Sequence, residues 1–478
     1  MKRSGLLVVL LAVGCLTSRP ELSSHLTLDE KIGQLFVFPA TGRFMNEESA
    51  EYRALVHQVR DNRVGGILWY LLSDVSETAR LNRRLQAIAR RPLLIAADLE
   101  AGVGMRFLDT TNWPWPMAVA ATGDPSFAER EGRVVAEEAR SLGVNQVYAP
   151  VADVNLDPAN PAINVRSYGE DPETVGRFVA AFVRGVQAGG VLATVKHFPG
   201  HGDTRIDSHR ALPVLGADRE RLERVELVPF RAAIAAGVGA VMTAHLSIPA
   251  LDATPAPVRA LAPGENPETD DPAEIARDAT VPASMSPAVV DGLLRRDLGF
   301  AGLVVTDAVD MGGIVDHFDP GDAAVRAILA GGDQVIKSPD TDAANAGVRR
   351  AVADGRISAT RLDQSVARIL EARRRFPAPQ PDPEAPFRVI DRPEHRALAE
   401  EIAARAVTLV RETPRALPLM RGQRVVHLVV NDVASVAAPG RDLARELELR
   451  GATTTTPSVE AAAGVFARSL DASLRASG

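Results

Sequence analysis

The stretch that decides the fold is GVLATVKHFPGHGDTRIDSH, residues 190–209. Its first part, Val191–Val195, is an apolar and β-branched run, which is typical of a parallel strand buried on both faces. Where this run ends, titratable side chains follow at once, beginning with Lys196 and His197. Because the carboxyl ends of the strands build the active site of an α/β barrel, the stretch predicts that fold and places a functional site at the end of this strand.

The rest of the chain alternates between strand-like and helix-like patterns. Short apolar runs predict eight strands, at 35–38, 66–70, 93–97, 144–148, 190–195, 240–243, 302–306 and 333–336. Segments with helical periodicity lie between them, at 47–61, 75–90, 126–142, 173–189, 218–236 and 286–297, with closing helices to about 374. Eight strands that alternate with helices are the pattern of a (β/α)8 TIM barrel, an α/β fold.

The charge balance argues against a nucleic-acid partner. The 54 basic residues are outweighed by 61 acidic ones, for a formal net charge of −7, whereas a polyanion binder carries an excess of clustered positive charge. Arginine supplies nearly all of the positive charge, and the lysines are Lys2, Lys31, Lys196 and Lys337. A lysine kept in so arginine-rich a chain indicates that its compact ammonium group is needed there, and the neighbours of Lys196 make it the strongest candidate.

The N-terminus predicts export. Met1–Arg3 is a basic start, and Leu6–Val13 is an apolar core too short to span a membrane. Small residues precede Cys15, the one cysteine, in a pattern that resembles a bacterial lipobox, so lipidation of Cys15 is predicted and an internal disulfide is excluded. We expect an extracytoplasmic lipoprotein whose only membrane association is this anchor; a cleaved signal with a periplasmic or secreted soluble product is the alternative.

The motif KHFPGHGDT with the following DSH, within residues 196–209, resembles a signature of glycoside hydrolase family 3, and specifically of its β-N-acetylglucosaminidase branch. The resemblance covers roughly residues 26 to 375. It implies that Asp207 and His209 supply the general acid/base and that Lys196 and His197 bind sugar hydroxyls. The residue types agree with this, because a histidine can give and take a proton near neutral pH and a neighbouring aspartate can orient it.

Asp307 is the predicted nucleophile. It directly follows the buried run 302–306, where an unpaired charge is costly and therefore indicates a function. Retaining glycoside hydrolysis needs such a carboxylate together with a proton donor near the leaving oxygen. The surrounding TDAVDM also resembles the family's nucleophile motif, in which the Asp after Ser or Thr attacks the anomeric carbon. Asp310 competes in sequence, but we expect it to cap a turn or to support the site.

Two other strand ends carry candidate sugar-binding residues. The segment DLEAGVGMRF, residues 98–107, resembles the family's sugar-binding loop, which implies that Asp98 accepts from ring hydroxyls and that Arg106 donates to them. The block from Ile163 to Pro172 matches another family segment, which implies a further clamp by Arg166. For each of these residues alone, the alternative is an ordinary salt bridge.

The expected domain order is a lipoprotein-type signal peptide (1–14), an N-terminal linker (15–25), the catalytic barrel (26–376), a proline-rich linker (377–393) and a C-terminal domain (394–478). The last resembles the opening of the family's second, α/β sandwich domain, and is expected to be partial or shortened. Its predicted elements are helices at 394–405, 439–450 and 458–476 and strands at 407–410 and 425–430. The aperiodic segment 251–284 is expected to be an inserted loop on the active-site side or a surface excursion.

Two alternatives come from other classes of protein. Five side chains after the fifth strand could hold a divalent metal in a barrel hydrolase: His197, His201, Asp203, Asp207 and His209. Against this, barrel metal sites usually draw ligands from several strands, and His245 is the only other histidine at a strand end. A non-catalytic, surface-anchored binding protein is the second alternative, and the presence of both Asp307 and the Asp207–His209 pair argues against it.

The predicted function is that of a retaining β-N-acetylglucosaminidase, which hydrolyses terminal β-linked N-acetylglucosamine from cell-wall or related glycans through a covalent glycosyl-enzyme. No cofactor, metal or nucleic-acid partner is expected, and we expect a monomer. A family 3 β-glucosidase and an N-acetylglucosaminide phosphorylase stay open. Phosphorolysis stays open because a histidine acid/base adds no negative charge beside an incoming phosphate.

Overall fold

The computed structural model describes residues 25–41, 44–257, 279–379, 382, 384–411, 419–422, 424–426, 429–431, 441–455 and 458–460. The chain divides into two compact units, Met1–Val407 and Thr408–Gly478. The predicted signal peptide, Cys15, most of the first linker and the middle of segment 251–284 lie outside the described residues. Within the described part of the chain, no helix is both long and apolar enough to cross a membrane.

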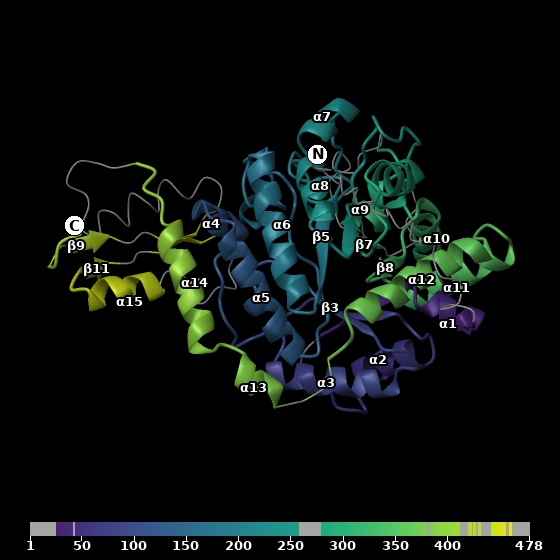
Figure 1. The fold of residues 1–478 in the computed structure, drawn as a ribbon, viewed down its shortest axis with the longest axis horizontal. Helices are drawn as coiled ribbons and strands as arrows, with labels where there is room; N and C mark the ends of the chain where they lie inside the picture. Colours follow the sequence, from purple (N-terminus) through teal and green to yellow (C-terminus); the bar gives the residue numbers. More distant parts are fainter. Residues whose placement is uncertain are drawn as a thin grey trace, which may run out of the picture. The chain divides into compact units, whose positions relative to one another are not determined.

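Eight parallel strands close into a barrel in the order of the sequence, because β8 pairs with β1 (Figure 1). The barrel confirms the predicted (β/α)8 fold. The side chains of β2, β3 and β6 are buried throughout, as expected for strands with helices outside and a packed interior inside. The strands are β1 (Phe36–Ala40), β2 (Gly66–Trp69), β3 (Leu94–Ala97), β4 (Gln146–Val147), β5 (Leu192–Phe198), β6 (Ala240–Thr243), β7 (Leu303–Ala308) and β8 (Gln334–Ile336).

Helices surround the barrel, and several begin where a short polar side chain accepts a hydrogen bond from the free backbone amides of the first turn. Asp74, Asp171 and Ser358 cap α3, α6 and α12 in this way. The helices of the barrel unit are α1 (Leu28–Gly33), α2 (Ala50–Arg60), α3 (Val75–Ile88), α4 (Pro116–Ala121), α5 (Ser126–Ser141), α6 (Pro172–Ala188), α7 (Arg219–Arg224), α8 (Leu227–Ala235), the π-type helix η5 (Ala288–Asp297), α9 (Gly312–Val315), α10 (Pro320–Ala330), α11 (Thr341–Ala353), α12 (Ala359–Arg375), α13 (Ala385–Val389) and α14 (Pro393–Ala406).

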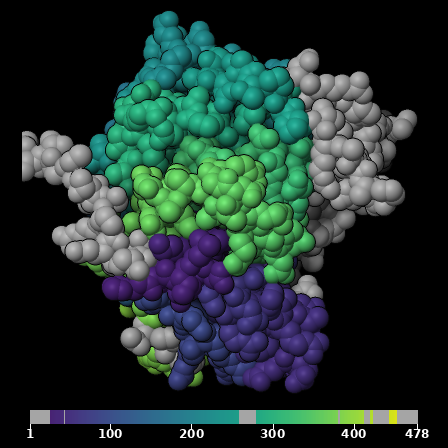
Figure 2. All heavy atoms as spheres, turned by 90° about the vertical axis from the view of Figure 1, so that its right-hand side faces the viewer, coloured from purple at the N-terminus to yellow at the C-terminus, as the bar shows by residue number. Residues whose placement is uncertain are grey.

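Helix α1 lies beside α11 and α12. In Figure 2 the purple N-terminal residues lie against the green residues of α11 and α12. Ion pairs join them: Lys31 Nζ is 2.5 Å from Asp363 Oδ1, and Arg349 pairs with Asp29. The barrel is therefore closed by contacts on its outside as well as by the pairing of β8 with β1.

Two strands change register where the predicted site residues lie. The pairing of β5 with β6 shifts between Val195 and Phe198, and the pairing of β7 with β8 shifts between Val305 and Ala308. Irregularities of this kind re-aim side chains beside active sites. Lys196 and His197 fall within the first shift and Asp307 within the second.

The barrel unit continues beyond the expected linker. The predicted helix at 394–405 is present as α14, which packs against α4 and α5 and belongs to the first unit. Buried His395 is bonded to buried Glu138 of α5, with 2.7 Å between Nδ1 and Oε1, and Ile402 is fully buried. Because these contacts join α14 to the barrel, the first unit ends at Val407 and not before residue 394.

The C-terminal unit contains two small parallel pairings and one helix among its described residues. β9 (Arg424–Val426) pairs with β11 (Thr453–Thr455), β10 (Val429–Asn431) pairs with β12 (Ser458–Glu460), and α15 spans Arg441–Leu449. The predicted strand at 407–410 is wrong: these residues are exposed, and no described strand pairs with them. A β-branched run forms a strand only where neighbours pack against it. Residues 458–460 are strand rather than helix, and the rest of the predicted last helix lies outside the described residues.

Candidate active site

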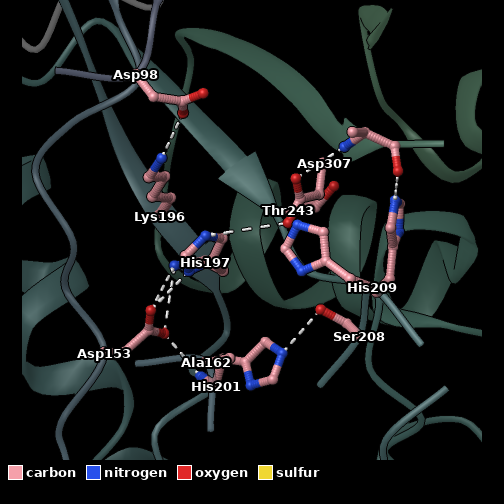
Figure 3. A network of polar contacts seen from close by, with 12 residues as sticks. Asp98, Asp153, Ala162, Lys196, His197, His201, Ser208, His209, Thr243 and Asp307 are labelled. Carbon is pink, nitrogen blue, oxygen red and sulfur yellow. Dashed lines mark hydrogen bonds and ion pairs between the residues drawn. The ribbon is translucent and has the colours of Figure 1, made fainter. Parts of the chain in front are cut away.

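The predicted site residues come together at the carboxyl-terminal mouth of the barrel. Asp98 follows β3, Lys196 and His197 lie near the end of β5, and Asp307 lies near the end of β7. Arg106 follows the 3₁₀ turn η2 (Val103–Met105), and Arg166 ends the turn η3 (Asn164–Arg166). Figure 3 shows Asp98 beside Lys196 and Asp307 facing His197, with the His209 imidazole on the same side as Asp307.

Lys196 and Asp98 form the centre of the predicted sugar clamp. Lys196 Nζ is 2.7 Å from Asp98 Oδ1, and Arg106 Nη2 is 3.3 Å from Asp98 Oδ2. Burial lowers the pKa of the Lys196 ammonium, but the charges of Asp98 and Glu100 raise it above its ordinary value. Lys196 therefore stays charged, and two carboxylates hold its ammonium group before any sugar binds.

Glu100 is a site residue that sequence reasoning missed. Its side chain is only 1 % exposed and accepts two hydrogen bonds from Arg166, at 2.7 and 2.8 Å, and Lys196 Nζ lies 2.6 Å away. Burial raises the pKa of Glu100, but the charges of Arg166 and Lys196 lower it well below its ordinary value. Its position two residues after Asp98 at the same strand end was the available signal.

Asp153 is the second missed residue, and it holds His197. Its Oδ2 is 2.7 Å from His197 Nδ1, and its Oδ1 accepts a 2.7 Å hydrogen bond from the backbone amide of His201. The carboxylate is fully buried, as an acidic residue inside the apolar run 149–154 indicates. Because Asp153 engages Nδ1, His197 presents Nε2 to the mouth, where it lies 4.0 Å from Asp307 Oδ2.

Asp307 has the environment that a carboxylate nucleophile needs. Its side chain is 17 % exposed, and its Oδ1 accepts a 2.7 Å hydrogen bond from the Ala308 amide. Burial raises the pKa of Asp307, but His197, His245, the Ala308 amide and Lys196 together lower it to about 2. The carboxylate is therefore ionised at neutral pH, with one oxygen held and the other directed toward His197.

His245, which the sequence left without a role, supports the strand that carries Asp307. Its Nε2 is 3.0 Å from the Ala308 carbonyl oxygen, and its Nδ1 is 2.8 Å from Ser284 Oγ. The side chain is fully buried. It therefore orders the backbone next to Asp307 and does not face the mouth as an open ligand.

Asp207 and His209 form the predicted pair on the loop after β5. Asp207 Oδ1 is 2.7 Å from His209 Nδ1 and also accepts the His209 backbone amide at 3.0 Å. This hydrogen bond lowers the pKa of Asp207 to about 2 and raises the pKa of His209 above its ordinary value. The His209 side chain is 67 % exposed, so its Nε2 is open to a leaving group or to water.

Asp310 does not compete for the position of the nucleophile. It forms an ion pair with Lys337, with 2.6 Å between Oδ2 and Nζ, and Lys337 Nζ lies 4.4 Å from the centre of the Tyr70 ring. This pair crosses from the end of β7 to the end of β8. Asp310 thus supports the rim of the mouth, as expected.

The five side chains of the alternative metal site are engaged separately. His197 is hydrogen-bonded to Asp153, and Asp203 is hydrogen-bonded to Arg221. His201 is hydrogen-bonded to Ser208 and Thr204. Among the residues that the structure describes, no three His, Cys, Asp or Glu side chains are grouped so that they could hold a metal ion.

An ionised carboxylate and a histidine that can give and take a proton are the two groups that retaining glycoside hydrolysis requires. Placed at the mouth of a closed barrel beside a charged clamp, they define a barrel glycoside hydrolase. Residues 27–372 match the model of the glycosyl hydrolase family 3 N-terminal domain. The chain belongs to glycosyl hydrolase family 3.

Relatives of known activity carry the comparison further. The chain is 34 % identical to a β-N-acetylglucosaminidase/β-glucosidase of Cellulomonas fimi over 86 % of this chain and 69 % of that protein. It is 34 % identical to β-hexosaminidase A of Pseudoalteromonas piscicida over 77 % of this chain, but it spans only 63 % of that protein's length. The structure of a family 3 β-N-acetylglucosaminidase from Paenibacillus sp. str. FPU-7 superposes with a TM-score of 0.77 and 34 % identity, covering 94 % of this chain and 83 % of that one.

Proposed function

We propose that this chain is a retaining β-N-acetylglucosaminidase that releases terminal β-linked N-acetylglucosamine. The observation that carries the proposal is the Asp207–His209 pair on the loop after β5, on the same side of the mouth as the ionised Asp307 (Figure 3). A histidine in place of a second carboxylate distinguishes this site from the two-carboxylate arrangement of most glycosidases. The β-N-acetylglucosaminidase and β-hexosaminidase names of the relatives support the same substrate class.

The reaction proceeds in two steps at one carbon atom. Asp307 attacks the anomeric carbon while His209 donates its proton to the leaving oxygen, which forms a covalent glycosyl-enzyme. Water then attacks the same carbon, His209 takes the proton from that water, and the bond to Asp307 breaks. Asp207 holds the imidazole by Nδ1 and stabilises the imidazolium that forms when His209 takes the proton.

The clamp holds the sugar for both steps. Asp98 accepts hydrogen bonds from ring hydroxyls, Arg106, Arg166 and Lys196 donate to them, and His197 bonds a hydroxyl through Nε2. Asp98, Glu100 and Asp153 hold these groups in place. Because they are already oriented and partly desolvated, they lose little freedom on binding, and this is the condition under which polar groups stabilise a transition state most.

The decisive experiment compares two substrates that differ in one group. We expect p-nitrophenyl N-acetyl-β-glucosaminide to be cleaved with a kcat/KM well above that of p-nitrophenyl β-glucoside, and with retained configuration in the first product. Activity that is abolished by a chelator and restored by a metal would instead support the metal-dependent alternative. A preference for the glucoside would make the chain a β-glucosidase.

Phosphate distinguishes hydrolysis from phosphorolysis at the same site. His209 is a neutral base when it activates the acceptor, so it does not repel an incoming anion as a carboxylate would. Adding inorganic phosphate and measuring N-acetylglucosamine 1-phosphate decides the acceptor. Hydrolysis predicts free N-acetylglucosamine at an unchanged rate, whereas a phosphorylase would form the sugar phosphate and turn over faster.

The proposal extends to the location and the natural substrate. A lipid-anchored, extracytoplasmic monomer would act on N-acetylglucosamine-containing fragments of the cell wall, and its signal peptide and the small residues before Cys15 support export and lipidation. Cys15→Ala is expected to move the protein from the membrane fraction to the soluble fraction without a change in kcat/KM. Unchanged partitioning in a cell fractionation would contradict the lipid anchor.

A further inference from the structure

His209, the proposed acid/base, lies on a loop, and the side chain of His209 does not anchor that loop. His209 is two-thirds exposed, and its Nδ1 is hydrogen-bonded to Asp207 on the same loop. A proton donor must nevertheless lie within hydrogen-bond reach of the leaving oxygen. The residue beside it, Ser208, is buried. The position of His209 therefore depends on what holds Ser208.

The buried imidazole of His201 holds Ser208 from the side of β5. His201 Nε2 is 3.0 Å from Ser208 Oγ, and His201 Nδ1 is 2.8 Å from Thr204 Oγ1. Burial lowers the pKa of His201 to about 4, so the ring is neutral at neutral pH and has one donor and one acceptor for the two hydroxyls. Figure 3 shows the His201 ring directed at Ser208 and away from Asp307.

The same histidine is tied to the sugar clamp. Its backbone amide donates to Asp153 Oδ1 at 2.7 Å, while Asp153 Oδ2 is 2.7 Å from His197 Nδ1. One buried carboxylate thus holds the clamp histidine with one oxygen and the support of the acid/base loop with the other. Asp153 therefore helps to set the positions of both the bound sugar and His209.

A second contact holds the loop from the side of β7. The amides of Gly312 and Gly313, at the start of α9, donate to the carbonyl oxygens of His209 and Ser208 at 3.0 and 3.2 Å. A Cβ at Gly312 would overlap the carbonyl oxygen of Arg210, so the loop rests directly on the glycine backbone. Because α9 follows Asp307 closely in the chain, this contact relates His209 to the nucleophile.

We infer that His201 and Ser208 form a positioning brace that holds the His209 imidazole at the leaving oxygen, so that they act on proton transfer and not on sugar binding. The inference rests on the proposed function, in which His209 is the acid/base. The side chains of both residues are engaged away from the sugar clamp, because their hydrogen bonds are to each other and to Thr204.

The test uses the full chain and two aryl N-acetylglucosaminides. The 2,4-dinitrophenyl leaving group needs no proton, whereas the phenyl leaving group does, and kcat/KM reports the first step for both. Ser208→Ala is expected to lower kcat/KM for the phenyl substrate about tenfold, a part of the roughly 10²–10⁴-fold that a general acid contributes. For the dinitrophenyl substrate the loss should stay below about twofold.

Substitution of His201 gives an independent variant. The amide of His201→Gln reaches toward Ser208, as Nε2 does, whereas that of His201→Asn reaches only toward Thr204. We expect His201→Asn to lose phenyl-substrate activity as Ser208→Ala does, and His201→Gln to recover part of it. In a His209→Ala background, Ser208→Ala should cause no further loss on the phenyl substrate, because the two changes remove the same step.

A matched control removes the same kind of contact on the other side of the site. Ser284 is a buried serine bonded to the buried His245, which supports Asp307 and not His209. Ser284→Ala should change both substrates by the same factor. Equal losses on both substrates in Ser208→Ala, or additive losses in the double variant, would overturn the brace.

The outcomes also separate this inference from the proposed function. If His209→Ala itself shows no contrast between the two leaving groups, the acid/base assignment fails and the brace fails with it. If His209→Ala shows the contrast and Ser208→Ala and His201→Asn do not, only the brace is overturned. Thermal melts followed by circular dichroism identify any variant that has lost its fold.

Discussion

At the scale of single residues, the site is an arrangement of charges that are oriented before substrate binds. Glu100 and Asp153 are buried carboxylates. Glu100 holds the guanidinium of Arg166, and Asp153 holds the imidazole of His197, whose Nε2 is directed to the mouth. Their desolvation is costly unless a partner is present, and Arg166, Lys196 and His197 are those partners. The contacts that offset the desolvation of these two carboxylates therefore also hold the polar groups of the proposed sugar clamp in place.

Asp307 provides the first prediction at this scale. Asp307→Ala should lower kcat for p-nitrophenyl N-acetyl-β-glucosaminide on the order of 10⁴-fold or more, because no other carboxylate can form the covalent intermediate. A mechanism-based fluorosugar should label Asp307 in the unaltered protein, as peptide mass spectrometry can show. Asp310→Asn is the control and should keep most of the activity, since Asp310 pairs with Lys337. Labelling of Asp310, or no labelling, would contradict the covalent mechanism.

The second prediction concerns pH. Asp307, with a pKa of about 2, is ionised over the whole working range, so the protonated form of His209 sets the alkaline limb of kcat/KM. The hydrogen bond from Asp207 raises the pKa of His209, so the protonated acid persists to higher pH than an ordinary imidazole with a pKa of about 6.5. Asp207→Asn should move the alkaline limb to lower pH.

The control for this shift is on the same loop. The carboxylate of Asp203 is directed to Arg221, with 2.9 Å between Oδ2 and Nη2. Asp203→Asn should therefore leave the alkaline limb where it is. A limb that stays in place in Asp207→Asn would show that another group titrates there.

At the scale of elements, β7, the strand that carries Asp307, is held by one buried carboxylate at its opposite end. Asp333, just before β8, accepts the Val304 amide of β7 at 3.0 Å and bonds Arg295 of η5 at 2.7 Å and Arg368 of α12 at 2.9 Å. Burial raises the pKa of Asp333, but these arginines lower it below its ordinary value. One side chain thus joins two strands to the two helices outside them.

Removing that carboxylate should destabilise the barrel strongly. Asp333→Ala leaves the largely buried Arg295 without its partner, and breaking a buried pair in this way typically costs about 3–5 kcal/mol. Asp322→Ala is the matched control: it removes an Asp–Arg pair with Arg326 on the half-exposed face of α10 and should cost less than about 1 kcal/mol. Urea denaturation measures both free energies of unfolding.

The pH dependence of that difference has a definite sign. A carboxylate with a lowered pKa in the folded state contributes stability that is present above its unfolded pKa of about 3.9 and is lost as the pH falls below it. The difference in the free energy of unfolding between the unaltered protein and Asp333→Ala should therefore be largest at neutral pH and become smaller in acid. A difference that is small at pH 7 would show that the arginines find other partners.

At the scale of the whole molecule, α14 belongs to the barrel unit although it follows the proline-rich linker. His395, Leu398, Ala399 and Ile402 are buried, and His395 bonds Glu138. The described site residues all precede this helix. A chain that ends after Val407 should therefore keep the barrel's thermal unfolding midpoint and its kcat/KM on an aryl N-acetylglucosaminide.

A shorter chain is the matched comparison. Ending the chain after Asp391 removes α14, exposes the apolar face that it covers on α4 and α5, and leaves Glu138 without its imidazole. This variant should have a thermal unfolding midpoint several degrees lower, because a loss of about 3 kcal/mol of stability lowers the midpoint of a large domain by several degrees. Equal melting of the two chains would contradict the assignment of α14 to the barrel, and lost activity in the longer one would show that Thr408–Gly478 contributes to the site.

The sequence by itself determined the barrel and the strand ends at which Asp98, Lys196, His197 and Asp307 lie, and it predicted these residues as members of the site. These follow from local patterns: strand and helix periods, and titratable residues directly after buried runs. The tertiary structure alone decided the contacts of Glu100 and Asp153, and the attachment of α14. The physical reason is that each is a contact between residues remote in the chain, such as Glu100 with Arg166, 66 positions away, or Glu138 with His395, 257 positions away, which no local pattern specifies.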